Sequence, residues 1–196
     1  MTMHVVAGSQ KGRRLKQPIG PGLRPTSGRV KEALFSMIAS RLPDARILDL
    51  YAGTGALGLE ALSRGAREVF FVENQTASLH VLRENILRCG STAYSTIIAQ
   101  DVLTFLSTAT LRPHPTPFNL VFADPPYETT DFLPLLTQLD SSRRVDSRGM
   151  VVIEHFKKVS LPQEAGGLRQ IRQSRYGDTM LTFYQIASPS KEKECA

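Results

Sequence analysis

Three short apolar stretches of the sequence end in or lead to an acidic residue, and a fourth contains one. Glu73 ends "EVFFVE", Asp101 follows "STIIAQ", Asp124 ends "FNLVFAD", and Asp49 lies within "RILDLY". Such stretches are typical of buried strands. Carboxylates at strand ends accept hydrogen bonds from hydroxyl and amine groups, or balance a positive charge. These four residues mark a candidate ligand site.

The stretch "RILDLY" leads into Gly53-Thr-Gly55-Ala-Leu-Gly58, which matches the pattern G-x-G-x-x-G. Glycines at a strand-to-helix turn let the backbone approach a ligand closely, as in sites for the pyrophosphate of a dinucleotide. Glu73 lies twenty residues after Gly53, where an acidic side chain can accept hydrogen bonds from both ribose hydroxyls of a nucleoside. Enzymes that use NAD and enzymes that use S-adenosylmethionine share both features.

Asp49 separates these two cofactor classes. A carboxylate four residues before Gly53 disfavours a pyrophosphate, whereas the ammonium group of S-adenosylmethionine would pair with it. An Asp that only caps the turn is the alternative. Farther along, Asp101 can accept a hydrogen bond from an adenine amine while the amide of Val102 donates to the ring. A plain helix N-cap at Asp101 is equally compatible with the sequence.

The tetrapeptide Asp124-Pro125-Pro126-Tyr127 follows the fourth apolar stretch. The two prolines force the chain out of a sheet and fix carbonyl oxygens that can accept N–H groups. Asp124 adds a stronger acceptor that could take a proton, and Tyr127 offers a ring face for stacking. Acceptors aimed at an exocyclic amine can turn its lone pair toward a methyl sulfonium. The motif therefore predicts methyl transfer to a base amine and disfavours a dehydrogenase.

From residue 46 onward, apolar stretches alternate with segments of helical periodicity. The predicted strands are 46–51, 68–73, 95–100, 118–124 and 149–155, the predicted helices are 57–64, 75–89, 102–107 and 132–139, and two further β segments lie within 168–187. Repeated strand–helix units predict an α/β, Rossmann-like fold with a mostly parallel sheet and helices on both faces. The closing hairpin places antiparallel strands at its edge. Ligands in such folds bind at the carboxyl ends of the strands.

The N-terminal part is strongly basic. The chain has 196 residues and a net charge of +6, and residues 1–31 carry seven Lys and Arg but no Asp or Glu. Extended pieces at 4–7 and 13–16 predict a hairpin around a polar turn. A basic arm that contacts phosphates is one interpretation of this segment, and a solvated surface is the other.

We therefore expect three parts: a basic β-hairpin extension (1–27), a methyltransferase domain (28–187) and a disordered tail (188–196). The two cysteines lack disulfide or zinc spacing, and no apolar run reaches transmembrane length. None of the four histidines has a metal-ligand spacing. These features predict a cytoplasmic protein without a metal site.

Several motifs together point to one family. They are Gly8, Lys11-Gly-Arg13, "RPTSGRVKEALF" from Arg24, "LDLYAGTGALGLEALSRGA" from Leu48, "VEN" from Val72, "DPPY" from Asp124 and "YGDTMLTFY" from Tyr176. On these residues the chain resembles, over 4–186, the bacterial small-subunit (16S) ribosomal RNA guanine-N2 methyltransferases of the RsmD type. It departs from them at Gly28, where the family usually has an acidic residue, and at Tyr51, where an aromatic is kept as Tyr instead of Phe.

The resemblance implies a class I methyltransferase that transfers a methyl group from S-adenosylmethionine to N2 of one guanine in 16S rRNA. The implied cofactor contacts are Asp49, Tyr51, Gly53, Thr54, Gly55, Glu73, Asn74, Asp101 and Val102. The implied contacts of the flipped guanine are Asp124, Pro125, Pro126 and Tyr127. The implied RNA contacts are Lys11, Arg13, Arg14, Lys16, Arg24 and Arg29. The expected substrate is a small ribosomal subunit or its assembly intermediate, and we expect a monomer.

Two alternatives remain. DNA adenine-N6 or cytosine-N4 methyltransferases can share Asp-Pro-Pro-Tyr, although they usually carry a larger target-recognition region than this chain has room for. A ribosome assembly factor could bind the cofactor without turnover. The cluster of Arg169, Arg172 and Arg175 predicts either a second RNA contact or a solvated strand face, and His155 could line the edge of a pocket.

Overall fold

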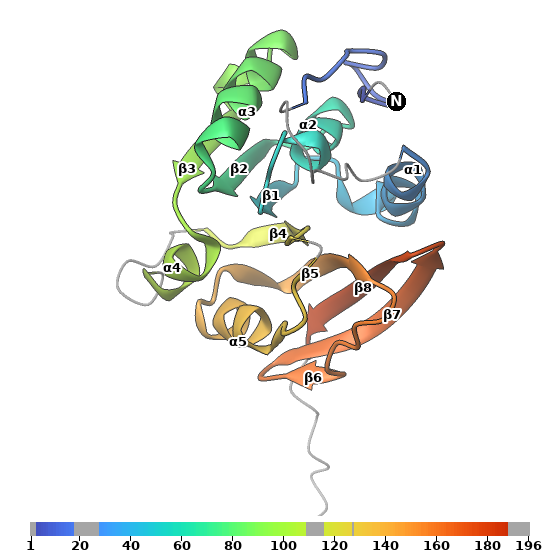
Figure 1. Ribbon diagram of the computed structural model, residues 1–196, viewed down its shortest axis with the longest axis vertical. Coiled ribbons are helices and arrows are strands. Elements are labelled where there is room, and N and C mark those ends of the chain that lie inside the picture. Colours follow the sequence, from blue (N-terminus) through green and yellow to red (C-terminus); the bar gives the residue numbers. More distant parts are fainter. Residues whose placement is uncertain (1–2, 18–27, 109–115, 127, 188–196) are drawn as a thin grey trace, which may run out of the picture.

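The computed structural model describes residues 3–17, 28–108, 116–126 and 128–187, and an eight-stranded sheet forms its centre (Figure 1). The strands are β1 (Arg46–Leu50), β2 (Glu68–Glu73), β3 (Ser95–Ala99), β4 (Phe118–Ala123), β5 (Val145–Phe156), β6 (Glu164–Ala165), β7 (Leu168–Tyr176) and β8 (Thr179–Ile186). The α-helices are α1 (Gly28–Met37), α2 (Ala56–Ser63), α3 (Thr76–Arg88), α4 (Val102–Ser107) and α5 (Leu133–Ser141), and the 3-10 helices are η1 (Ala39–Arg41) and η2 (Thr92–Tyr94).

The strand order in the sheet is β3-β2-β1-β4-β5-β8-β7-β6. The pairs from β3 to β5 are parallel, and β8, β7 and β6 add an antiparallel edge. This confirms the predicted fold class. The chain runs from β1 outward to β3 and then returns to β4 on the other side of β1, so the strand order reverses between β1 and β4. Such a switch point is where open α/β sheets bind ligands.

Helices cover both faces of the sheet (Figure 1). Helices α1, α2 and α3 pack on one face through side chains such as Leu34, Leu59 and Leu82. Helices α4 and α5 pack on the other face through side chains such as Phe105 and Leu136. Because both faces are covered, all five residues of β1 are buried, as expected for a central parallel strand.

Strand β5 begins four residues before the predicted strand. Val145 pairs with Phe118, and the register then shifts before Met150 pairs with Leu120. The shift coincides with Gly149, where an added Cβ would lie 2.9 Å from the backbone oxygen of Asp146. Because residues 146–148 are polar, the apolar pattern of the sequence does not indicate this irregular start of the strand.

Residues 3–17 fold back on themselves next to α2 (Figure 1). The reversal agrees with the predicted hairpin, but its strands are reduced to one isolated bridge between His4 and Arg14. Val5 and Leu15 are buried in the core shared with α1 and α2. The ladder is short because backbone groups of this N-terminal segment bond to the domain; Ser9 N–H, for example, donates to Ser63 O at 2.8 Å.

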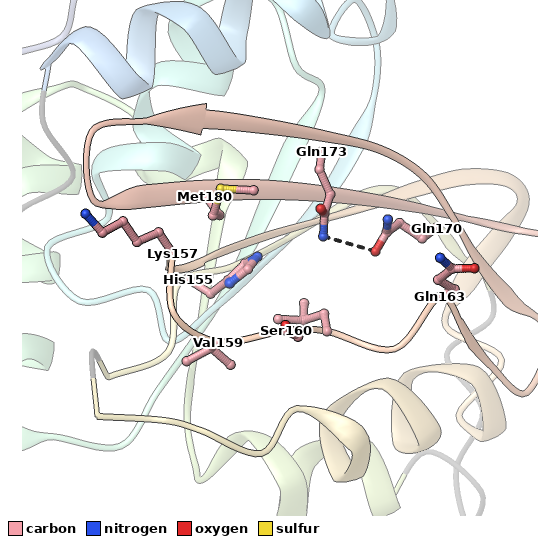
Figure 2. Close-up of a pocket in the computed structure, with 9 residues that line it drawn as sticks. His155, Lys157, Val159, Ser160, Gln163, Gln170, Gln173 and Met180 are labelled. Carbon is pink, nitrogen blue, oxygen red and sulfur yellow. Dashed lines mark hydrogen bonds between the residues drawn. The ribbon is translucent and has the colours of Figure 1, made fainter.

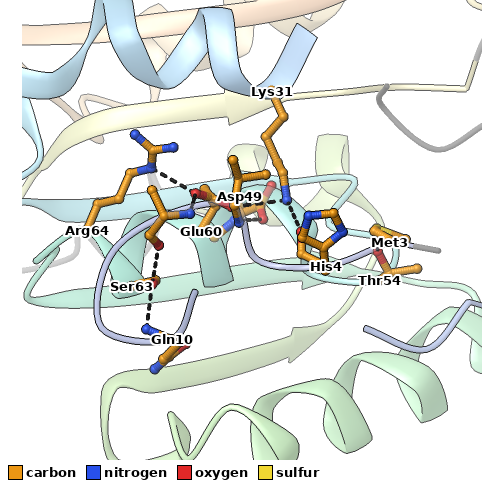
Figure 3. A network of polar contacts seen from close by, with 12 residues as sticks. Met3, His4, Gln10, Lys31, Asp49, Thr54, Glu60, Ser63 and Arg64 are labelled. Carbon is orange, nitrogen blue, oxygen red and sulfur yellow. Dashed lines mark hydrogen bonds and ion pairs between the residues drawn. The ribbon is translucent and has the colours of Figure 1, made fainter. Parts of the chain in front are cut away.

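Glu60 of α2 is fully buried and holds this N-terminal segment (Figure 3). Its carboxylate accepts the N–H groups of Val6 (2.7 Å) and Ala7 (3.0 Å), and it forms ion pairs with Lys31 of α1 (3.0 Å) and Arg64 (2.8 Å). Burial alone would raise the pKa of Glu60. The hydrogen bond from Val6, the charge of Lys31 and the hydrogen bonds from Arg64 and Lys31 together outweigh burial and lower this pKa below its ordinary value.

Some predictions fall on residues outside the described ranges: the RNA contact Arg24, the base contact Tyr127, and the tail 188–196. Within the described ranges, no helix has the length and apolar character needed to cross a membrane. The same residues contain no group of three or more His, Cys, Asp or Glu side chains placed to hold a metal ion.

Gly8 and Gly12 test the packing of the N-terminal segment, because both have a φ of +85° and only Gly8 lies against the domain. A Cβ on Gly8 would lie 1.8 Å from Ser63 O, whereas a Cβ on Gly12 meets nothing within 4 Å. Gly12→Ala should cost only backbone strain of about 1–2 kcal/mol. Gly8→Ala should detach the segment and speed hydrogen exchange of its amides. Equal exchange rates in the two variants would contradict this packing.

Glu60→Gln should lower the free energy of unfolding at neutral pH by about 3 kcal/mol, because it leaves Lys31 and Arg64 without their partner charge. The pKa of Glu60 is lowered by folding. Its stabilising contribution is therefore complete above the unfolded pKa and is lost as the pH falls through the folded pKa. Denaturant titrations should show the variant and the wild type converging at acid pH. Glu32→Gln, at an exposed position on α1, is the control, and a gap that stays constant into acid would refute the assignment.

Candidate active site

The loop between β1 and α2 has three residues with positive φ: Tyr51 (+57°), Gly53 (+54°) and Gly55 (+79°). Gly55 is the N-cap of α2, and its N–H donates to Ala52 O at 2.8 Å. Positive φ costs a residue with a side chain about 1–2 kcal/mol, so Tyr51 is held there by the surrounding structure. The loop brings the chain from the end of β1 directly into α2 at the switch point of the sheet.

The three glycines of the motif have different surroundings. A Cβ on Gly55 would lie 2.5 Å from Leu82 of α3, and a Cβ on Gly58 would lie 2.3 Å from Phe71 of β2. These two glycines allow α2 to pack closely on its neighbours. A Cβ on Gly53 would meet nothing closer than 3.9 Å. Gly53 therefore leaves backbone accessible to a ligand.

Glu73 ends β2 and accepts three backbone N–H groups. Gly53 donates to Oε2 at 2.8 Å, while Asn74 and Gln75 donate to Oε1 at 2.9 and 2.8 Å. The carboxylate thus ties the glycine loop to the neighbouring strand. An ionised carboxylate has about four acceptor positions, so Glu73 keeps capacity for the ribose hydroxyls that the sequence predicts as its partners.

Asp49 is 2% exposed and lies in the middle of the sheet. Its Oδ2 accepts the N–H of Gly58 at 2.9 Å. Burial raises the pKa of Asp49 well above its ordinary value, and the charges of Asp124 and Glu73 raise it further, while the bond from Gly58 acts in the opposite direction. Asp49 therefore also has, in part, the capping role that the sequence left open, because it accepts a backbone N–H group of α2.

Asp101 is the N-cap of α4, and Val102 is the buried first residue of that helix. The N–H of Thr104 donates to Asp101 Oδ1 at 2.9 Å. This cap is the alternative that the sequence left open, and it occupies one oxygen of an exposed side chain. Burial raises the pKa of Tyr51, and the negative charge of Asp101 raises it further.

Asp124 directly follows β4, and its N–H donates to Leu50 O at the end of β1, at 3.5 Å. Pro125 is buried and Pro126 is exposed. The carbonyl of Pro126 accepts the N–H of Thr129 at 2.8 Å, which closes a turn after the two prolines. The candidate base-binding segment therefore leaves the sheet beside the glycine loop. Tyr127 lies outside the described residues.

The basic candidates are spread over the N-terminal segment and α1. Lys11, Arg14 and Arg29 are exposed. Arg13 donates to the carbonyl oxygen of Arg88 at 3.0 Å, and Lys16 pairs with Glu84 at 2.8 Å. Arg13 and Lys16 are thus held on α3 by local contacts.

Asn85 is a site residue that the sequence did not reveal. It is fully buried on α3, and its side-chain Nδ2 donates to Lys16 O (3.1 Å) and to Thr54 O (2.9 Å). Its Oδ1 accepts the N–H of Lys16 at 2.7 Å. Thr54 also contacts the sulfur of Met3 through Oγ1, at 3.6 Å. The glycine loop and the N-terminal segment are therefore joined through one buried amide.

The donor set fits S-adenosylmethionine. Asp49, Glu73 and Asp124 surround one loop whose backbone is accessible at Gly53. Among the described residues, no Lys, Arg or His forms an ion pair with Asp49 or Glu73. A pyrophosphate would be repelled by these charges, whereas a ligand with an ammonium, a sulfonium and ribose hydroxyls matches them.

Comparison with known sequences agrees with this chemistry. A family model described as "Conserved hypothetical protein 95" matches residues 3–185. The chain is 37% identical over 183 residues to "Putative rRNA methyltransferase YlbH" of Bacillus subtilis (strain 168), which covers 93% of this chain and 98% of that protein. It is 31% identical over 185 residues to "Ribosomal RNA small subunit methyltransferase D" of Escherichia coli (strain K12), with coverage of 93% and 89%.

Solved structures show the same architecture. "Putative methyltransferase yhhF from Escherichia coli" superposes with a TM-score of 0.82 at 29% identity, covering 96% of this chain and all of that chain (100%). A hypothetical protein of Thermus thermophilus superposes with a TM-score of 0.79 at 32% identity, covering 93% and 99%. The fold is that of the class I methyltransferases.

Asp49→Asn removes the buried charge and keeps the shape of the side chain. If Asp49 faces the ammonium group of the cofactor, the variant should bind S-adenosylmethionine about 10–100-fold more weakly, since hydrogen bonds to charged groups are worth about 1.5–3 kcal/mol. Isothermal titration calorimetry measures this directly. Asp44→Asn is the control, because Asp44 is exposed and Asn tolerates its φ of +57°. Equal affinities in all three proteins would rule out the role of Asp49.

Proposed function

The chain belongs to the family described as Conserved hypothetical protein 95 and is an S-adenosylmethionine-dependent methyltransferase, and from this premise we propose that it methylates the N2 amine of a guanine in 16S rRNA. The observation that carries the proposal is the position of the Asp124-Pro125-Pro126 segment, which leaves β4 directly beside the glycine loop of β1. A base amine held by this segment would lie next to the cofactor. The rRNA substrate follows from the names of the relatives.

The residues of the chain would position the amine and hold its proton. S-adenosylmethionine supplies an electrophilic methyl group on a sulfonium. Asp124 and the carbonyl oxygen of Pro125 would accept the two N–H groups of the guanine amine, which would direct its lone pair toward that methyl group. Asp124 would accept the proton that N2 releases when it takes the methyl group from the sulfonium of the cofactor. Asp49, Glu73 and the backbone at Gly53 would hold the cofactor.

We assign the recognition of RNA to the basic N-terminal segment. Residues 1–27 would form an RNA-contacting extension of a methyltransferase domain formed by 28–187. Lys11 and Arg14 of this extension, together with Arg29 of α1, would contact phosphates. The link from this segment to the glycine loop through Asn85 would couple RNA contacts to the cofactor site. We further infer a monomer that acts in the cytoplasm on the small subunit or its assembly intermediate, where the target base must leave its stack.

The proposal is tested by transfer of labelled methyl groups from S-adenosylmethionine to naked 16S rRNA, unmethylated small subunits and duplex DNA, followed by nucleoside analysis. The wild type should produce N2-methylguanosine in the rRNA or the subunit. Asp124→Ala should lose about 100-fold or more in kcat, as expected for the loss of a preorganised polar group. Glu128→Ala, an exposed carboxylate in the same loop, should retain activity.

Each other outcome has a distinct meaning. Label in DNA alone would overturn the rRNA substrate and support a DNA amino-methyltransferase. Cofactor binding without transfer to any substrate would support an assembly factor. Full activity of Asp124→Ala would remove this residue from the chemistry.

A further inference from the structure

A pocket of about 300 Å³ lies on the face of the sheet that α5 covers (Figure 2). It is bounded by β5, β7, β8 and the segment between β5 and β6. The side chains that matter for its chemistry are His155, Gln163, Gln170, Gln173 and Met180. This volume is at the lower end of the range for small-molecule sites and suits a ligand about as large as one nucleobase.

One residue that lines the pocket, His155, contacts the loop that follows the candidate catalytic segment. Ala123 of β4 pairs with Ile153 of β5, so His155 and Pro125, each two residues farther on, lie at the same edge of the sheet. Phe132, which precedes α5, packs edge-on against the ring of His155, with 5.8 Å between the ring centroids. The end of the loop that carries Asp124 therefore packs against a side chain that lines the pocket.

A β-bulge builds the polar side of the pocket. The register of β7 against β8 shifts between Gln170 and Arg172, and Ile171 is exposed. Residues three apart in a regular strand point to opposite faces. The bulge places Gln170 and Gln173 on the same face, where Gln173 Nε2 donates to Gln170 Oε1 at 3.2 Å (Figure 2). Bulges commonly re-aim side chains in this way next to functional sites.

A hydrogen-bond chain orients these amides. His155 Nδ1 lies 3.1 Å from the carbonyl oxygen of Phe156, which can only accept, so Nδ1 carries the proton and Nε2 accepts from Thr182 Oγ1 at 2.8 Å. Burial lowers the pKa of His155, which favours this neutral form. Gln173 Nε2 donates to Thr182 Oγ1 at 3.2 Å. Hydrogen bonds are therefore donated from Gln173 to Thr182 and from Thr182 to the buried His155, which fixes the orientation of the Gln173 amide.

This orientation leaves one acceptor and one donor on the side chains that line the pocket. Within the described part of the chain, Oε1 of Gln173 and Nε2 of Gln170 form no hydrogen bond; Gln170 is half-buried and Gln173 is exposed. An acceptor and a donor that line one pocket can bind the hydrogen-bonding edge of an unpaired base. Lys157 lies at the rim of the pocket, where it pairs with Asp178 at 2.8 Å.

Resting on the proposed function, we propose that this pocket binds the base of an unpaired nucleotide of the RNA substrate close to the guanosine that is methylated. The bulge supplies the paired amides, the hydrogen bonds to His155 and Thr182 orient them, and the contact between Phe132 and His155 links the pocket to the loop that carries Asp124. The pocket would contribute to the choice of guanine by binding a neighbouring base, because it lies outside the cofactor loop and the Asp124 segment.

The test uses the full chain and 16S rRNA, naked or assembled into subunits, in which one nucleotide near the methylated guanosine at a time is made abasic. In the wild type, one abasic position should raise KM about ten-fold with kcat unchanged, since a base contact of this kind is worth about 1–3 kcal/mol. The double variant Gln170→Ala/Gln173→Ala should raise KM on intact RNA by a similar factor. Combining the variant with that abasic RNA should cause no further rise.

Gln185→Ala is the matched control, because it removes a glutamine from β8 outside the pocket. Circular dichroism and cofactor affinity should be unchanged in all variants. A KM for the double variant equal to that of the wild type, or effects that simply add, would overturn the pocket assignment and leave rRNA methylation intact. Failure of the wild type to methylate any form of the rRNA would overturn the proposed function and this inference with it.

Discussion

The buried carboxyl group of Asp49 is the constraint on which the site depends. Burial and the charges of Asp124 and Glu73 raise its pKa, so the folded state loses stability as the pH rises through the pKa of Asp49. The N–H of Gly58 offsets only part of this cost. A cation bound beside Asp49 would lower its pKa again and stabilise the folded state. We therefore expect the switch point of the sheet to favour a positively charged ligand.

Two other buried charged residues, Arg46 and Glu60, have partners of opposite charge. Arg46, at the opposite end of β1, pairs with Glu68 at 2.5 Å and lies over the ring of Phe118. Glu60 is surrounded by two cations and two backbone N–H groups. Among the described residues, Arg144 is also buried without an ion pair, and it lies over the ring of Phe105. Asp49 differs from these residues because it lies at the switch point of the sheet, which favours a functional role over a structural one.

The sequence predicted the fold class, the glycine loop and the acidic strand ends, because these features are local patterns of period, turn chemistry and spacing. It could not reveal the contact between Glu60 and the N-terminal backbone, since residues more than fifty positions apart meet there. The sequence could not reveal the bulge that pairs Gln170 with Gln173 for a different reason. In a mostly polar strand, a one-residue shift in register does not interrupt any alternation of polar and apolar residues. For Asp101 the sequence left a cap and a base contact open, and the structure shows the cap.

The most direct test of this account is the pKa of Asp49, measured by carbon-13 NMR of its carboxyl group in the protein alone and with saturating S-adenosylhomocysteine, which keeps the ammonium group of the cofactor. We predict a pKa well above the ordinary value in the protein alone and a marked fall when the ligand binds. Asp44, which is exposed, should not respond. An unchanged pKa of Asp49 in the complex would contradict the claim that this carboxylate faces the cation of the cofactor.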